Sequence, residues 1–197
     1  MGRPSQVQSA DVIRFGMPRK DLHVTLGDVT VKPGLALGSW TAFMRTGDGA
    51  MVMGDLVLTE DEVGPVMRRL QESGIKITAI HNHLISESPH VVSMHIEGHR
   101  DAVKMAEAIH EALGLTKTPG FGERPVIRTP GHRSEGHRRY SRPQREGERW
   151  SSAVWRAAGH MLTEEPRLFF MHFWANDDAA RLAKGLKAAL DQTNSKK

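Results

Sequence analysis

The chain has 197 residues, of which 39% are hydrophobic and 25% are charged, and it contains no cysteine. This length suits one large domain or two small ones, and the lack of cysteine excludes disulfides, thiolate metal sites and a cysteine nucleophile. No apolar run approaches the roughly 18 residues of a membrane-spanning helix, so we expect no transmembrane segment. The formal charge of +4 would by itself suit a polyanionic partner.

Alternating apolar and polar residues predict an antiparallel meander in the first third of the chain. A hairpin is expected over residues 22–31, around a two-residue turn at Gly27-Asp28. A second pair of strands, residues 35–44 and 50–58, flanks the polar turn at residues 46–49.

A helix is expected directly after the meander. Thr59 and Glu62 match a capping box, in which each side chain satisfies a backbone N–H group of the other residue. Pro65 suits the first turn of a helix better than its interior. Two starts stay open: the helix begins directly after Thr59 with Pro65 inside it, or its first turn begins at Pro65 with residues 59–64 as a separate lead-in. Ser73-Gly74 is expected to end the helix.

The end of the chain repeats an earlier part. A shift of 77 residues aligns residues 160–166 with residues 83–89, and it places Met171-His172 on Met94-His95. Repeated motifs indicate a duplicated structural unit. We therefore predict an α+β fold, an antiparallel sheet packed with two helices per copy, which is complete in residues 10–118 and truncated to a strand and a helix in residues 158–194.

Residues 119–157 lie between the two copies and follow no secondary-structure period. Residues 120–150 hold 8 arginines and 4 glutamates, and the rest of the chain has 19 basic and 19 acidic groups. The segment is interpreted as a nucleic-acid-binding arm, as a disordered linker, or as coding sequence translated out of frame or joined by an internal deletion. We favour the last interpretation, and a nucleic-acid partner is therefore not expected.

Three histidines form a candidate metal site. His81 and His83 are two residues apart on a strand predicted over residues 75–83, so their side chains face the same side. His95 lies on the next predicted strand. If the two strands pair, the three imidazoles converge in a set that suits zinc or another divalent transition metal. His160 and His172 indicate a weaker equivalent in the second copy.

Other polar residues nearby are candidates for the chemistry of such a site. The candidate catalytic residues are Glu87, His99 and Asp101, of which Asp101 is also placed to cap a second helix. Together with Glu97 they are candidates for a fourth ligand, a partner of a ligand or a general base.

Two interpretations without a metal stay open. In one, His81 or His83 acts as an acid or base, assisted by Glu87; in the other, the histidines are structural. Asp55 and Glu60 flank the fourth predicted strand and could face a cleft, but we favour their interpretation as the acidic lead-in to the first helix, because acidic groups stabilise a helix N-terminus.

Several of these motifs resemble the LppY/LpqO-like family of bacterial proteins. They are residues 50–63, 79–84 and 94–96 in the first copy and residues 160–174 in the second. The resemblance covers residues 12–119 and 159–194. It implies two tandem copies of one domain and, for many members, export or a lipid anchor. A second meander and a second His-Asn-His are expected from the family but are missing, and the family brings no established activity.

We therefore expect an uncharacterised bacterial protein that binds a metal or acts as a metal-dependent enzyme, with hydrolysis or a lyase step on a small polar substrate as the simplest chemistry. The alternative is a non-catalytic extracytoplasmic module that binds a small-molecule ligand or has a structural role. Residues 1–10 show no export signal. The sequence as given predicts a cytoplasmic protein, whereas the resemblance implies an extracytoplasmic one if a leader is missing.

Overall fold

The computed structural model describes residues 5–121, 154–158, 165–166 and 170–193. These residues fall into two compact units, of which the second contains residues 174–193 and the first contains all the others. The described residues form antiparallel sheets and helices, so the predicted α+β class is confirmed.

The first unit is built around a six-stranded sheet in which each pair of neighbouring strands with a described register is antiparallel. In spatial order, the strands are β1 (Gln6–Ser9), β2 (Val12–Pro18), β5 (Gly38–Thr46), β6 (Gly49–Thr59), β9 (Val91–Arg100) and β7 (Lys76–His81). The middle of the sheet contains the second strand pair of the predicted meander, β5 and β6, whereas the hairpin predicted over residues 22–31 lies in a separate small sheet. The last of the six strands along the chain, β9, is inserted between β6 and β7.

Short strands form two smaller sheets. The predicted hairpin at Gly27-Asp28 is confirmed, and Gly27 has a φ of +59°, a left-handed conformation that glycine adopts without strain. The three-stranded sheet contains β4 (Val29–Thr30), β3 (Thr25–Leu26) and β8 (Glu87–Ser88), and the two-stranded sheet contains β10 (Val154–Ala158) and β11 (Phe170–Trp174).

Two of the sequence expectations differ from these strands. The strand expected over residues 35–44 starts later, because the short helix α1 (Pro33–Ala36) occupies its beginning. Strand β10 lies at the end of the predicted linker, where no regular structure was expected. The rest of that linker, residues 122–153, lies outside the described residues.

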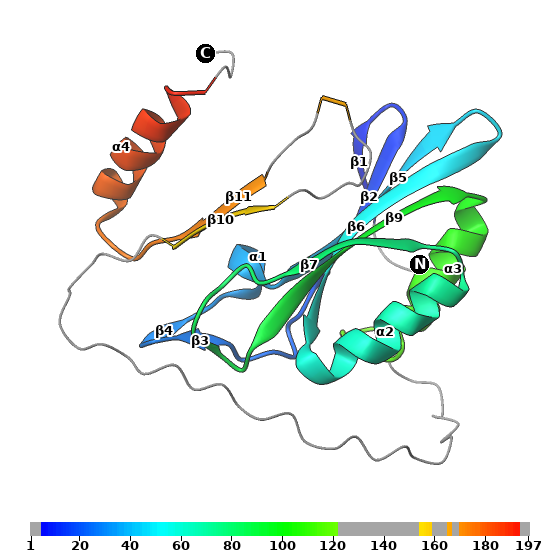
Figure 1. The fold of residues 1–197 in the computed structure, drawn as a ribbon, viewed down its shortest axis with the longest axis horizontal. Helices are drawn as coiled ribbons and strands as arrows, with labels where there is room; N and C mark the ends of the chain where they lie inside the picture. The colour runs from blue at the N-terminus through cyan, green and yellow to red at the C-terminus, as the bar shows by residue number, and fades with distance from the viewer. Residues whose placement is uncertain (1–4, 122–153, 159–164, 167–169, 194–197) are drawn as a thin grey trace. The chain divides into compact units, whose positions relative to one another are not determined.

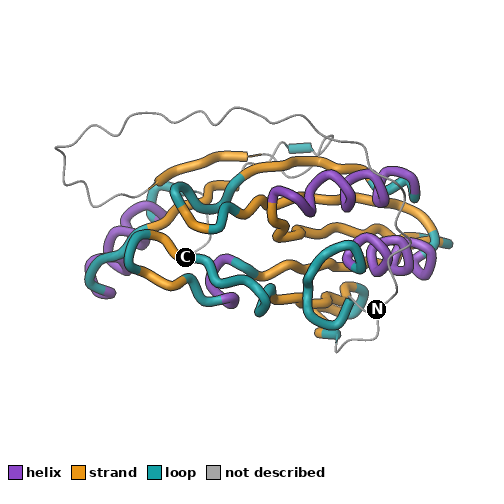
Figure 2. Tube along the Cα trace, turned by 90° about the horizontal axis from the view of Figure 1, so that it is seen from below, coloured by secondary structure: helices purple, strands orange, loops and turns teal. Residues whose placement is uncertain are grey.

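Helices α2 (Glu60–Glu72) and α3 (Ala102–Leu113) lie next to each other along the six-stranded sheet (Figures 1 and 2). Strand side chains alternate between the two faces of a sheet, and Leu56 of β6 and Met94 of β9 point into the core beneath the helices. Other members of this core are Val52, Leu58, Val66, Leu70, Ile96, Ile109 and Leu113. The odd-numbered residues of β6 and β9 consequently face away from the helices.

Helix α2 begins at Glu60, directly after the predicted Thr59 cap, so the alternative start at Pro65 is wrong. The predicted capping contact is present, since the backbone N–H of Thr59 donates to Glu62 Oε2 at 3.0 Å. Three acidic residues in the first turn favour this early start through the helix dipole. Pro65 is accommodated inside the helix, where it removes one backbone donor.

The caps of the other two long helices match the repeat in the sequence. Asp101 precedes α3 and accepts a hydrogen bond from the backbone N–H of Lys104 at 2.9 Å, as predicted. In the second unit, Asp178 precedes α4 (Ala179–Leu190) and accepts from the backbone N–H groups of Ala180 and Arg181. Asp101 and Asp178 are 77 residues apart, the spacing of the repeat.

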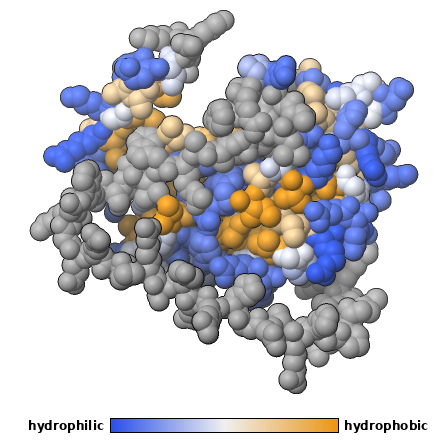
Figure 3. Space-filling view, in the orientation of Figure 1, coloured by the Kyte–Doolittle hydropathy of each residue, from blue (hydrophilic) through white to orange (hydrophobic). Residues whose placement is uncertain are grey.

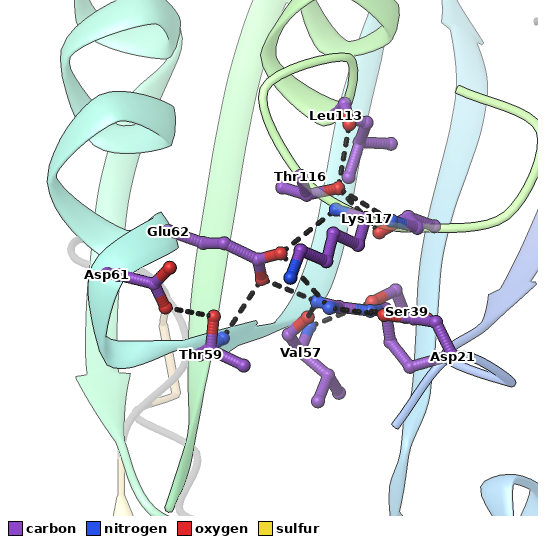
Figure 4. Close-up of polar contacts among 11 residues, drawn as sticks. Asp21, Ser39, Val57, Thr59, Asp61, Glu62, Leu113, Thr116 and Lys117 are labelled. Atoms are coloured by element: carbon purple, nitrogen blue, oxygen red, sulfur yellow. Dashed lines mark hydrogen bonds and ion pairs between the residues drawn. The ribbon is translucent and has the colours of Figure 1, made fainter. Parts of the chain in front are cut away.

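A buried ion pair joins four segments of the first unit. Arg19 is fully buried, and its Nη1 donates to Glu62 Oε2 and to the carbonyl oxygen of Val57, both at 2.7 Å. Glu62 Oε1 also accepts from the backbone N–H of Lys117 at 3.0 Å (Figure 4). The loop after β2, strand β6, the start of α2 and the chain after α3 are thereby held together.

Gly54 in β6 has no space for a larger side chain. A Cβ atom there would lie 2.8 Å from the carbonyl oxygen of Trp40 and 3.0 Å from Cγ2 of Thr41. Because backbone atoms must move to relieve these contacts, Gly54→Ala is expected to lower the free energy of unfolding by about 1–3 kcal/mol, measured by urea denaturation. Gly64→Ala in α2 is the control, since its Cβ meets no atom within 4 Å. Equal stability of the two variants would contradict this packing.

Hydrophobic residues gather near the middle of the face drawn in Figure 3, with hydrophilic residues around them. In the part of the chain that the structure describes, none of the helices is long and apolar enough to cross a membrane.

Candidate metal centre

Three neighbouring strands bring the candidate residues to one place. Strand β9 lies between β6 and β7, and its His95 is opposite Asp55 on β6 and Ala79 on β7. His81, at the end of β7, is opposite Ser93. By strand alternation these side chains belong to the sheet face away from α2 and α3.

The three predicted histidines converge, as the sequence indicated. One ring nitrogen from each of His81, His83 and His95 can be chosen so that the three atoms lie within 4.8 Å of one another. The rings of His81 and His95 are stacked with centroids 4.8 Å apart, and those of His81 and His83 are 5.1 Å apart. His83 lies two residues beyond the end of β7 rather than within the predicted strand.

Asp55 belongs to this cluster, so its interpretation as a helix lead-in is wrong. Its Oδ2 lies 3.7 Å from Nε2 of His83 and 3.9 Å from Nε2 of His95, and its side chain is 9% exposed. Burial raises the pKa of the Asp55 carboxyl to about 7, against the lowering effects of a hydrogen bond with Ser93 and the charge of Arg14. Glu60, in contrast, lies in the first turn of α2 as expected.

A signal for Asp55 is present in the sequence. It is the only charged residue of the apolar stretch from residue 50 to residue 58. A charged group in the interior of a central strand is costly unless neighbouring groups compensate for its burial. Such a position is therefore a functional candidate.

His172 of β11 lies beside the same histidines, within the first unit. Its ring is stacked on that of His83 with centroids 4.1 Å apart, and it is 5.2 Å from the ring of His81. Burial lowers the pKa of His172, which favours the neutral imidazole. The sequence placed His172 in a separate, weaker site with His160, a residue outside the described part of the chain.

The three candidate catalytic residues each have partners elsewhere. Glu87 Oε1 lies 2.8 Å from Nδ1 of His90 and accepts from the backbone N–H of Val91 at 3.2 Å, so it orders the loop before β9. Nε2 of His99 is 2.7 Å from the hydroxyl of Thr46. Asp101 caps α3.

A family model described as a domain of unknown function (DUF1259) matches residues 1–115 and 155–192, and the matched residues include His81, His83, His95, Asp55 and His172. The chain belongs to this family. No curated protein and no solved structure matches this chain.

The donor set of this DUF1259 protein suits a metal ion. Neutral imidazoles and a carboxylate are ligands for zinc and other divalent transition metals. Ligand nitrogens around a tetrahedral zinc ion are about 3.3 Å apart, given Zn–N bonds of about 2.0 Å. The nitrogens of the three histidines already lie within 4.8 Å, so modest side-chain rotations would bring them to that spacing.

Proposed function

We propose that this protein binds a divalent transition metal ion through His81, His83 and His95. The observation that carries the proposal is the convergence of three imidazole nitrogens within 4.8 Å. His81 and His95 come from one sheet face, where the pairing of β7 with β9 sets their relative positions, and His83 follows two residues after the end of β7.

The Asp55 carboxylate supports the same proposal. Three neutral imidazoles bring no negative charge to a dication, whereas Asp55 Oδ2 is close to both His83 and His95 and is almost fully buried. A carboxylate in this position orients imidazole ligands and offsets the charge of the ion. The cost of burying Asp55 is then compensated by the bound cation.

A metal held here would supply Lewis acidity and a bound water of lowered pKa. The protein groups around it would then hold and orient a small polar substrate and transfer protons, and Asp55, with Oδ2 at 3.7 Å from His83 and 3.9 Å from His95, is one candidate acid–base group. This chemistry favours hydrolysis or a lyase step. We therefore propose, beyond metal binding, that the protein is a metal-dependent enzyme.

Metal content tests the proposal directly. Purified protein is stripped with a chelator, incubated with Zn²⁺ or Co²⁺, freed of excess ions and analysed by elemental mass spectrometry. We expect about one ion per chain in the wild type, and a loss of at least about tenfold in occupancy for His81→Ala/His83→Ala, because two of three ligands are removed.

His99→Ala is the matched control, since His99 contacts Thr46 and not the cluster. It should retain the ion, and circular dichroism should show that all variants are folded. A folded wild type that retains no ion from either metal would overturn the proposal and favour structural histidines.

A further inference from the structure

We propose that His172 is a fourth protein ligand of this metal, so that the site is built jointly by the first copy and strand β11. This inference rests on the proposed function. The sequence predicted one site in each copy, whereas the structure brings His172 to the histidines of the first copy.

The repeat places His95 and His172 at equivalent positions. Both follow a methionine, both lie in a strand, and they are 77 residues apart. In the structure, His95 is stacked on His81 and His172 is stacked on His83. Two equivalent histidines thus contact the two histidines of a single His-Asn-His segment.

The ring spacings fit a shared ion. Imidazoles around one tetrahedral zinc ion have ring centroids about 5 Å apart, given Zn–N bonds of about 2.0 Å. The centroid of His172 lies 5.2 Å from that of His81 and 4.1 Å from that of His83. The separations among His81, His83 and His95 are 4.8, 5.1 and 6.2 Å. His172 is therefore as close to His81 and His83 as those two residues are to each other. Among the described residues, the group of ring nitrogens within 4.8 Å of one another contains only His81, His83 and His95, so binding would require the ring of His172 to rotate.

A fourth histidine changes the role of the metal. Zinc sites that keep an open position are catalytic, whereas sites with four protein ligands are closed and structural. With His172 bound, the ion would connect β11 to the sheet through His81, His83 and His95. Release of His172 would open one coordination position, so this residue would control access of a substrate to the ion.

Cobalt spectroscopy on the full chain distinguishes this inference from the proposed function. Co²⁺ reports its coordination through its visible absorption, and competition with a chelator gives its affinity. We expect His172→Ala to weaken Co²⁺ binding by about tenfold to a hundredfold and to change the visible spectrum. Met171→Ala, on the exposed neighbour in β11, should change neither.

Hydrogen exchange supplies an independent readout. Co²⁺ should protect the amides of β11 in the wild type and in Met171→Ala, but not in His172→Ala. A wild type that binds no Co²⁺ would overturn the proposed function itself. Binding by His172→Ala with unchanged affinity, spectrum and protection would overturn only the role of His172.

Discussion

Replacing Arg19 with methionine is expected to lower the free energy of unfolding by about 3–5 kcal/mol, because removal of one partner leaves a buried charge without its counterion. Arg19 is fully buried, and the Glu62 carboxylate that it contacts is 7% exposed. Methionine fills part of the volume of arginine but donates no hydrogen bond, so Glu62 and the carbonyl of Val57 both lose a donor.

Urea denaturation of wild type and variant measures this loss, and Arg69→Met is the matched control. Arg69 also contacts a carboxylate, that of Glu111, but the two side chains are 35% and 48% exposed. An ion pair as exposed as this contributes about 0–1 kcal/mol. If Arg19→Met cost no more than Arg69→Met, the buried pair would have no special role in stability.

A bound metal is expected to stabilise the fold by an amount set by its concentration. An ion that binds only the folded state adds about 4 kcal/mol when its free concentration is about 1,000 times the dissociation constant. The midpoint of thermal unfolding should therefore rise when Zn²⁺ is added, and excess chelator should reverse the increase.

Asp55→Asn should reduce this stabilisation, because the variant loses the buried negative charge beside His83 and His95. A loss of about tenfold to a hundredfold in affinity is expected, which lowers the stabilisation by Zn²⁺ by about 1.4–2.7 kcal/mol at the same concentration of the ion. Asp48→Asn, in the exposed turn before β6, should behave like the wild type. Equal stabilisation of the two variants by Zn²⁺ would exclude Asp55 from the site.

The convergence of the three histidines could be predicted because it depends on local rules. The two-residue period of a strand predicted that His81 and His83 share a face, and the two rings are close although His83 lies just beyond β7. A short loop then leads to the strand of His95. Asp55 could not be assigned in the same way. Its position opposite His95 depends on the insertion of β9 between β6 and β7, and strand order in a sheet is a tertiary property.

Tertiary contacts of the helices and of strand β11 could not be predicted from the sequence either. Glu62 was identified as part of a capping box, but its contact with Arg19 joins residues 43 positions apart in the chain. His172 was identified through the repeat, which indicates equivalent positions but not the site to which each belongs. The sequence left the start of α2 open because proline prefers the first turn of a helix, and the acidic first turn and the packing of α2 outweigh that preference.

The location of the cluster at the end of β7 has a consequence for the choice of metal. His95 and Asp55 lie on strands that are hydrogen-bonded along both sides, so the backbone at these two residues is held rigidly. His83 lies beyond the last paired residue of β7, and its backbone is not constrained by that ladder. The backbone at Asp55 and His95 is thus rigid, whereas the backbone at His83 can move. Such a site can close around ions of different radius, and its preference among metals would then depend on donor chemistry more than on size.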